Sequence, residues 1–597
     1  MSILSNGYYS LRARINKVGN DTGEEEQEGV ASSLTPELEV DLDEDELIKL
    51  ANQWKKNWDK KIDSLPDLRR ENEHYWLGIQ SDYQGGRSGH GHHENRDNVL
   101  FEAVETFIPL ATSANPEPLV VADNTVEGEE LADTVRKQLT YIADTSRLKL
   151  DLKRAVRFWL LYYVGVAKIS WDFPSDEIKT DVIRPQQLIL DPEASVESAE
   201  YTGQYIGHVR KDTAETLVKR FPKKKEEIKK LVKDKMMTEL RYTEWWTTDV
   251  LFWKVNDIIL DIKRNPHWNY NSTREEVTTD EFGVETTEEV EERGRNHFSE
   301  RKMPFVFLSV FNVGKHPYDQ TSLVEQVISI QDSINLRRRQ IDANASQMNT
   351  SIIADADVVT KEQLAQAARA LAVGLPIRVS GGERSVGRNN VPPLPSFVFD
   401  ALIDDRTQLR NIFGVSGSSP QGVRGERTVR GKIQIQGQDA DRIGSGIGEY
   451  VEEFADGIYN WWVQMMFVYY NEEHHAAVVG KDSAMEFTSL RRDDFNKKLL
   501  VSVKPGSLVP KDDLTKRNEA IDLWAAGAID PVTLFDKIGY ADPNDAAKRL
   551  FQWQSNPASL FPQEAQQAEA QAPQEVPVEG ALPPLPPIQE ALNQQIQ

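Results

Sequence analysis

The chain has 597 residues, more than one hydrophobic core supports, and this length indicates roughly three or four domains. It contains no cysteine, which excludes disulfides, thiolate nucleophiles and Cys-based zinc or iron–sulfur sites and fits a reducing cytoplasm. The net charge is −25, whereas proteins that grip nucleic acid normally gather Lys and Arg. Taken alone, this acidity indicates only solubility.

No secretory or membrane segment is expected. The first residues, MSILSNGYYSLRARIN, lack the apolar run of a signal peptide. The longest apolar run, Phe158 to Ala167, is about half the length that a membrane-spanning helix needs. We therefore interpret it as a buried part of a soluble domain.

The N-terminal half alternates between helical and β-type patterns. Residues 1–45 are rich in Glu and Asp and predict a flexible acidic arm. A helix follows, because Leu47, Leu50, Trp54 and Trp58 recur at helical spacing. The further predicted elements are a Gly-rich loop (82–93), helices at 102–110, 130–141 and 148–165, and strands at 166–171, 180–190, 201–210 and 249–262.

An acidic segment lies between Arg274 and Arg293, with nine acidic residues and no basic one. Thr and Val alternate around Gly283, so we predict a solvated β-hairpin that protrudes from the core.

A long helix is the clearest element of the chain. Residues 321–373 contain neither Pro nor Gly, and Leu323, Val327, Ile330, Ile334 and Ile341 form a narrow apolar stripe. A helix over 322–350 would be about 40 Å long at 1.5 Å per residue.

Smaller elements follow. We predict strands at 351–354 and 377–379 around a helix that starts at Thr360, with Gln363 at the capping-box position. The remaining predicted elements are a helix at 397–413, a Gly-rich loop at 414–425, a kinked helix from 428 to about 470, a β-prone stretch at 485–503, short helices at 513–526, 531–537 and 543–553, and a Pro/Gln-rich tail.

Searches for catalytic patterns give no candidate. Gly425 to Ile433 has five residues between its glycines, and Ile433 follows Lys432, where a phosphate-binding loop has four and Ser or Thr. His90, His92 and His93 lie in the Gly-rich loop, where a solvated role outweighs metal binding. We therefore predict a protein that is not an enzyme, with no catalytic residues, no metal and no cofactor.

The order of four stretches resembles the portal, or head-to-tail connector, family of tailed bacteriophages, most like the podovirus type. Similar family features are a wing helix and strands, a first stem helix whose most typical part is 331–335, a second stem helix with a Gly-rich tunnel loop, and a helical crown. The matching stretches are 158–194, 316–344, 397–475 and 517–550. The acidic segment 275–292 has no counterpart in this pattern.

The resemblance implies an α+β, mainly helical portal fold that forms a ring. The implied domains are a flexible N-terminal arm (1–45), a wing (46–315), a first stem helix (316–350), a clip (351–396), a second stem helix with the tunnel loop (397–430), a tunnel-to-wing helix with a wing β segment (431–510), a crown (511–560) and a C-terminal tail (561–597).

The resemblance also implies a function. Portal subunits form dodecameric channels at one capsid vertex, through which double-stranded DNA is packaged and ejected. The implied partners are the large terminase, the major capsid and scaffolding proteins, and the head-completion and tail adaptor proteins. Assembly would take place in the host bacterial cytoplasm and the final location would be the virion. An acidic channel wall would repel DNA and let it slide.

Candidate DNA contacts follow from the same resemblance. They are the tunnel-loop residues Gly414, Ser418, Gln421, Arg424, Arg427 and Arg430, and the stem residues Arg337, Arg338 and Arg339. For the stem arginines, salt bridges between subunits are at least as good an interpretation. Two other classes stay open, namely a different virion connector, such as an adaptor or tail subunit, and a nucleotide-driven packaging enzyme.

Overall fold

The structure, a computed structural model, divides the chain into two compact units, residues 1–478 with 485–510 (unit 1) and residues 479–484 with 511–597 (unit 2). The residues it describes are 43–79, 97–112, 115–197, 199–233, 235–268, 272–279, 285–292, 296–311, 313–348, 352–354, 360–362, 365, 386–388, 393–415, 444–479, 485–495, 498–505, 507, 513–539 and 543–555.

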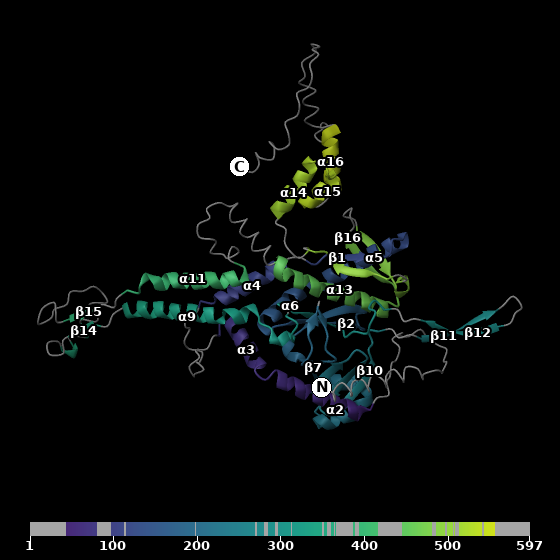
Figure 1. Ribbon diagram of the computed structural model, residues 1–597, viewed down its shortest axis with the longest axis horizontal. Helices are drawn as coiled ribbons and strands as arrows, with labels where there is room; N and C mark the ends of the chain where they lie inside the picture. The colour runs from purple at the N-terminus through teal and green to yellow at the C-terminus, as the bar shows by residue number, and fades with distance from the viewer. Residues whose placement is uncertain are drawn as a thin grey trace, which may run out of the picture. The chain divides into compact units, whose positions relative to one another are not determined.

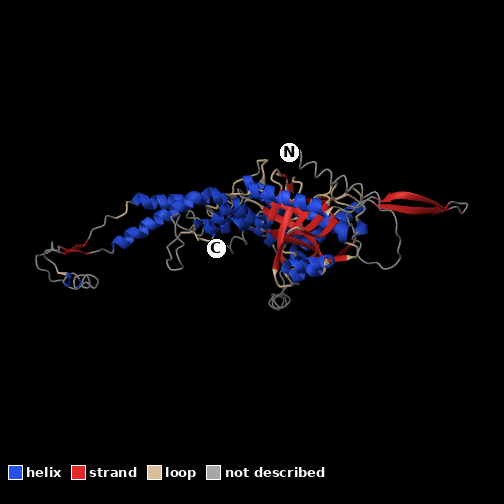
Figure 2. Ribbon diagram, turned by 90° about the horizontal axis from the view of Figure 1, so that it is seen from below, coloured by secondary structure: helices blue, strands red, loops and turns tan. Residues whose placement is uncertain are grey.

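Unit 1 is an α+β assembly of helices packed around antiparallel sheets (Figures 1 and 2). Its main helices are α2 (Glu44–Lys61), α3 (Leu65–Trp76), α4 (Val99–Ala111), α5 (Val126–Thr145), α6 (Leu148–Tyr162), α7 (Ala214–Arg220), α8 (Lys225–Val232), α9 (Leu323–Met348), α11 (Ser396–Phe413) and α13 (Glu449–Tyr469). Short helical turns are η1 (Pro185–Gln187), η2 (Pro222–Lys224), η3 (Pro317–Asp319), the π-helical η4 (Gly444–Gly448) and η5 (Arg492–Asp494).

Two sheets form the β part of the core. The larger has the order β10-β9-β8-β7-β4 and the smaller has the order β13-β2-β3. Their strands are β2 (Gly165–Asp172), β3 (Glu177–Ile183), β4 (Leu188–Leu190), β7 (Ile206–Thr213), β8 (Glu239–Trp246), β9 (Val250–Val255), β10 (Ile258–Arg264) and β13 (Phe305–Leu308).

The remaining strands form two-stranded pairs. They are β1 (Pro118–Val121) with β18 (Leu500–Val503), β5 (Val196–Glu197) with β6 (Glu200–Tyr201), β11 (Ser272–Thr279) with β12 (Glu285–Glu292), β14 (Ile352–Ala354) with β15 (Val386–Arg388), and β16 (His474–Val479) with β17 (Met485–Leu490).

Helix α13 lies at the centre of the larger core and is buried along most of its length. The indole nitrogen of Trp462 donates to the Thr180 hydroxyl at 2.9 Å, and the Tyr459 hydroxyl donates to the Pro116 carbonyl at 2.6 Å. A Cβ at Gly457 would lie 2.7 Å from a Val306 methyl, so this glycine lets the helix approach β13 closely. Of the predicted kinked helix from 428 to about 470, residues 428–443 lie outside the described residues; the π-helical turn η4, which carries three glycines, lies directly before α13.

Helix α2 confirms the first predicted stripe. Leu47, Leu50, Trp54 and Trp58 are all buried, and the Trp54 ring stacks on Tyr205 with centroids 4.4 Å apart. The Asp43 side chain accepts a hydrogen bond from the Asp45 amide and caps the helix. The helix thereby closes the second core, which is built on the five-stranded sheet.

Helix α6 ends earlier than the predicted boundary at residue 165. Tyr163 has a φ of 74°, a left-handed conformation that stops the helix, and β2 begins at Gly165. A Cβ at Gly165 would lie 2.5 Å from the Ala155 carbonyl oxygen, so the return of the chain along α6 requires glycine. The apolar run 158–167 therefore belongs to two elements.

Helices α9 and α11 run side by side as a helix pair (Figure 1). Of the predicted stripe, Leu323, Val327 and Ile334 are buried, whereas Ile330 and Ile341 are partly buried. The pair is joined by the segment that holds β14 and β15, and β14 confirms the predicted strand at 351–354. The predicted strand at 377–379 and most of the predicted helix from Thr360 lie outside the described residues.

The acidic hairpin and the C-terminal helices are present as predicted. The acidic segment forms the hairpin β11–β12, and the three C-terminal helices are α14 (Asp513–Ala525), α15 (Pro531–Ile538) and α16 (Pro543–Ser555) in unit 2. Strand β8 was not predicted. Of the predicted arm (1–45), residues 1–42 lie outside the described residues, as does the loop at 82–93, whereas Glu44 and Asp45 belong to α2. Among the described helices, none combines the length and apolarity needed to cross a bilayer.

A buried ion pair sits between the two main sheets. The Lys168 ammonium on β2 lies 2.5 Å from the Glu244 carboxylate on β8, and both side chains are less than a tenth exposed. Burial raises the pKa of Glu244, but the adjacent Lys168 charge outweighs this and holds that pKa at about 2. Nearby, burial lowers the pKa of His208 and of His267 to about 3, and the Lys168 charge adds to the effect.

These shifts predict acid destabilisation of unit 1. An unfolded chain protonates both histidines below about pH 6.5, whereas the folded chain takes up these protons only near pH 3. The free energy of unfolding should therefore fall by up to ~1.4 kcal/mol per pH unit for each histidine between pH 6 and pH 4. The measurement is urea unfolding followed by tryptophan fluorescence. His208→Gln should reduce the slope and His475→Gln, at an exposed site, should not; equal slopes in all three proteins would contradict the prediction.

Candidate functional site

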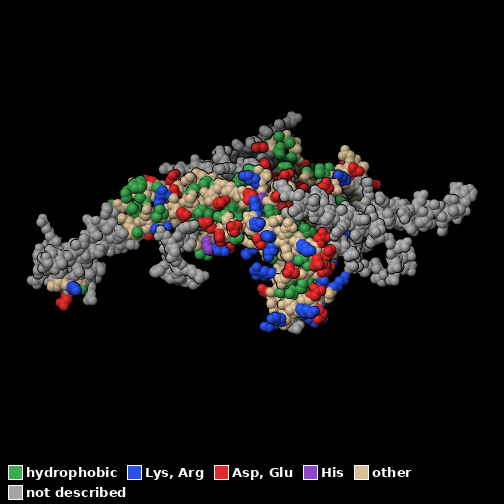
Figure 3. All heavy atoms as spheres, turned by 60° about the horizontal axis from the view of Figure 1, so that its bottom comes forward, with side chains coloured by type: hydrophobic (Ala, Val, Ile, Leu, Met, Phe, Trp, Pro, Cys, Tyr) green, Lys and Arg blue, Asp and Glu red, His purple; other side chains and the backbone are tan. Residues whose placement is uncertain are grey.

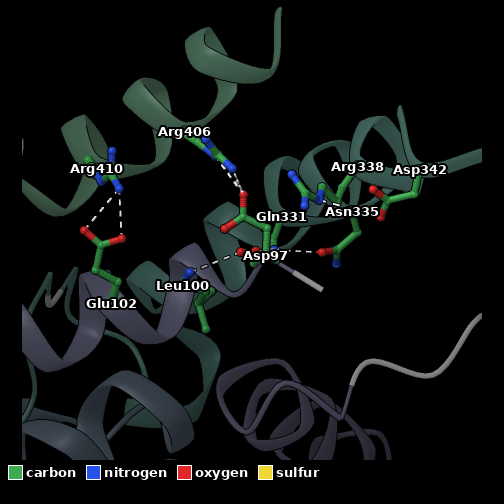
Figure 4. Close-up of polar contacts among 9 residues, drawn as sticks. All are labelled: Asp97, Leu100, Glu102, Gln331, Asn335, Arg338, Asp342, Arg406 and Arg410. Atoms are coloured by element: carbon green, nitrogen blue, oxygen red, sulfur yellow. Dashed lines mark hydrogen bonds and ion pairs between the residues drawn. The ribbon is translucent and has the colours of Figure 1, made fainter. Parts of the chain in front are cut away.

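The base of the helix pair is a polar seam between α9, α11 and the start of α4 (Figure 4). The fully buried Gln331 side chain accepts a hydrogen bond from the Leu100 amide at 3.1 Å and donates to the Asp97 carbonyl at 2.7 Å. It also donates to the Asn335 side chain one turn along α9, at 3.2 Å. Gln331 thus satisfies one of the amides that the first turn of α4 leaves without an intrahelical partner.

Two arginines on α11 reach the same end of α4. Arg406 and Arg410 are four residues apart and so lie on one face of the helix. The Arg406 Nε donates to the Asp97 carboxylate at 2.7 Å, and one Arg410 nitrogen lies 2.8 and 3.1 Å from the two Glu102 oxygens. Both acidic residues lie at the N-terminal end of α4, where the helix dipole favours negative charge.

The inner part of the helix pair is therefore fixed to the body of unit 1. Tyr75 on α3 adds a further tie, since its hydroxyl donates to Asp332 of α9 at 2.7 Å. On α11, Leu409 and Phe413 are buried in the same region. Movement of the pair relative to α4 would break several of these contacts together, so the two parts respond as one.

The outer part of the helix pair exposes apolar side chains. Phe397 is 67% exposed and Phe399 45% exposed, on either side of the buried Val398. Because successive residues turn by about 100° around a helix, the two rings lie on opposite flanks of the inward face. Leu336 of α9 is 52% exposed. Hydrophobic side chains are visible on this part of the surface in Figure 3.

The predicted stem arginines directly follow Leu336 on the outer part of α9. Arg337 forms an ion pair with Asp405 across the helix pair, and Arg338 lies 3.7 Å from Asp342 on its own helix. Arg339 is exposed. The structure therefore pairs Arg337 and Arg338 with carboxylates of the same chain.

The predicted tunnel loop is described only at its start. Gly414 is buried, has a φ of 72° and forms the C-cap of α11, so it ends the helix. Ser418, Gln421, Arg424, Arg427 and Arg430 lie outside the described residues. The P-loop-like segment 425–433 and the histidines at 90, 92 and 93 do so as well.

Sequence reasoning identified Gln331 only as a typical residue of the resemblance and did not identify its partners. It also missed Arg406 and Arg410, although their spacing of four on one helix is a detectable signal of a shared contact. Within the described part of the chain, no group of three or more His, Asp or Glu side chains is placed to hold a metal ion.

Comparisons with known proteins add little. No family model matches the chain, and no curated protein matches it. A solved structure described as the virion of a native gene transfer agent particle contains a chain that is similar over 74% of this chain and 89% of its own length. The sequence identity is 12% and the TM-score is 0.35. A likeness at this level assigns neither fold nor function.

The polar seam predicts a graded loss of stability. Arg410→Met should lower the free energy of unfolding by ~2 kcal/mol, because it removes charged hydrogen bonds and leaves Glu102 without them. Arg410→Lys should recover part of the loss, since it keeps the charge without the guanidinium fork. Urea denaturation measures both.

The matched control is Arg338→Ala, at a half-exposed pair on the outer part of α9. It should cost less than about 0.5 kcal/mol. Equal losses at Arg338 and Arg410 would show that the contact with α4 does not hold the helix pair.

Proposed function

We propose that this chain is a portal subunit of a tailed bacteriophage. In this role it forms a ring at one capsid vertex and lines a channel for double-stranded DNA. It has no enzymatic activity of its own and takes no cofactor, and chemical work belongs to the large terminase that docks on the ring. The protein is then a structural component of the virion, assembled in the host cytoplasm.

The observation that carries the proposal is the α9–α11 helix pair, fixed at its base and apolar at its outer part. A pair of helices that leaves the body covers only the faces that meet each other. Phe397 and Phe399 extend the apolar surface to both flanks of α11, where a neighbouring copy would lie on each side. Contacts between two different flanks are heterologous, and repeated around a closed rotation they give rings.

The order of elements supports the same proposal. The first helix of the pair leaves an α/β body, a small segment with β14 and β15 follows, and α11 returns to the body. In the portal interpretation these parts are the wing, first stem helix, clip and second stem helix, and the helices of unit 2 form the crown. The clip would dock the terminase during packaging and the head-completion and tail adaptor proteins afterwards.

Charge supports passive passage of DNA. The chain carries a net charge of −25, and a ring multiplies it. Phosphates meet repulsion at an acidic wall, which weakens grip and favours sliding. The pairing of Arg337 with Asp405 and of Arg338 with Asp342 lowers the positive charge that the stem offers to DNA. The loop residues Arg424, Arg427 and Arg430 remain the proposed guides.

If the subunits form a ring through the helix pair, ring assembly should depend on the exposed Phe397 and Phe399. Phe397→Glu combined with Phe399→Glu should raise the protein concentration needed for assembly at least tenfold, because burial of each ring contributes about 1.5–3 kcal/mol and each 1.4 kcal/mol is tenfold. Native mass spectrometry and particle images measure this, with a twelve-fold ring expected for the unmodified protein.

The control is Phe487→Glu on β17, which is 75% exposed and outside the helix pair. It should assemble as the unmodified protein does. A monomer or an open tube from the unmodified protein at all concentrations would refute the ring, and normal assembly of the double variant would refute its basis.

A second candidate, a nucleotide-driven packaging enzyme, rests only on the incomplete P-loop pattern at 425–433. The purified protein should hydrolyse ATP no faster than a Lys432→Ala variant, measured by phosphate release with and without double-stranded DNA. Hydrolysis that depends on Lys432 would favour the enzyme over the portal.

A further inference from the structure

A cavity of about 1010 Å³ opens between the two main sheets of unit 1. Its lining, which we call the cleft, comes from β2, β3, β7, β8, β9 and β10 and from the turns near Arg220 and His267. The lining holds eight Lys and Arg residues against four Asp and Glu residues. In a chain with a net charge of −25 this is a local reversal of sign.

The excess positive charge lies at the rim of the cleft. Its floor contains the buried Lys168–Glu244 pair, whose charges cancel. Lys179 and Lys263 lie 3.6 and 3.8 Å from carboxylates on their own strands. Among the described residues, no carboxylate forms an ion pair with Lys211 or Arg220. The Arg220 guanidinium lies instead over Trp253, 5.5 Å from the ring centroid.

The acidic hairpin β11–β12 carries an excess of negative charge. The two strands contain seven Glu and one Arg, and their register sets Glu275 opposite Glu289 and Glu276 opposite Glu288. Like charges at directly opposed positions destabilise an antiparallel pair. A two-stranded ribbon is also marginal by itself in water. A basic surface along the ribbon would relieve both costs.

We propose that the acidic hairpin of one subunit docks in the cleft of a second copy of this chain. The two surfaces are complementary in charge, since the cleft lining has an excess of Lys and Arg and the hairpin strands have an excess of Glu. The contact is heterologous, because the hairpin and the cleft are different surfaces of the same chain, and such contacts form a ring when the rotation between neighbours closes. The inference rests on the proposed ring for the presence of a neighbour.

The geometry favours the hairpin of a neighbouring subunit, and not the subunit's own hairpin, as the occupant of the cleft. His267 lines the cleft, and β11 begins five residues later at Ser272, so the hairpin starts near the edge of its own cleft. Eight residues of strand extend about 27 Å at 3.4 Å per residue. Figure 2 shows the ribbon standing clear of both sheets of its subunit. A ribbon of this length that leads away from the cleft of its own subunit is long enough to contact the cleft of a neighbouring subunit.

The test uses the absence of native cysteine, which makes introduced thiols the only ones in the full-length protein. Thr287→Cys in the hairpin and Lys211→Cys at the rim are combined in one chain, oxidised after assembly and separated on a non-reducing denaturing gel. Docking between copies gives a ladder of linked dimers, trimers and larger species. Docking within one chain gives a linked monomer and overturns the proposal.

The matched control pairs Thr287→Cys with Glu129→Cys, an exposed position on α5 that does not line the cleft. Its ladder should be at least fivefold weaker. Glu288→Lys with Glu289→Lys should reduce the ladder of the Thr287/Lys211 pair by a similar factor, and the addition of Arg220→Glu should restore it. A charge-independent ladder would overturn the electrostatic basis.

Native mass spectrometry of the same samples separates the two proposals. A ring without a ladder overturns the docking and leaves the portal function standing. A ladder from an open filament supports the docking and overturns the closed ring. A monomer without a ladder overturns both.

Discussion

The amide group of Gln331 carries the contact on which the arrangement of unit 1 depends. One side chain from α9 holds the Leu100 amide and the Asp97 carbonyl at the beginning of α4, in a fully buried setting. A buried amide whose partners are lost costs about 1–3 kcal/mol, so the register between α9 and α4 is strongly specified. Arg406 and Arg410 then fix α11 to the same turn of α4, and the helix pair acts as a rigid extension of the body.

The two ends of the helix pair differ in their contacts. Near the base, apolar burial and charged hydrogen bonds stabilise the single chain. Farther out, Val398 and Leu402 are buried while Phe397 and Phe399 are exposed. Among the described residues, the outer part therefore leaves an apolar surface exposed, and the fixed base determines where that surface is presented.

Local patterns predicted most of the elements and few of the contacts. The window without Pro or Gly specified α9, and the Trp54 and Trp58 spacing specified α2, because burial of one face imposes a period that sequence displays directly. The end of α6 was misplaced, since both α6 and β2 are buried and the break depends on the left-handed Tyr163, which apolarity does not signal. Strand β8 was missed because its buried run of Trp245 and Trp246 follows an irregular charged stretch. The polar seam joins residues more than 230 positions apart, and no periodicity reports such a pairing.

The net charge of the chain did not reveal how its charges are distributed in the structure. The total of −25 indicates repulsion of DNA, yet a basic rim and an acidic ribbon coexist in one unit. Because Lys168 and Glu244 neutralise each other at the floor, the cleft does not depend on an occupant for its folding. The rim offers exposed pairs, each worth at most about 1 kcal/mol and weakened by salt. Such contacts are too weak to join two free subunits, but in a ring each is repeated and held at high effective concentration. Because each of these contacts is weak, docking of this kind would allow neighbouring subunits to change their relative position within the ring.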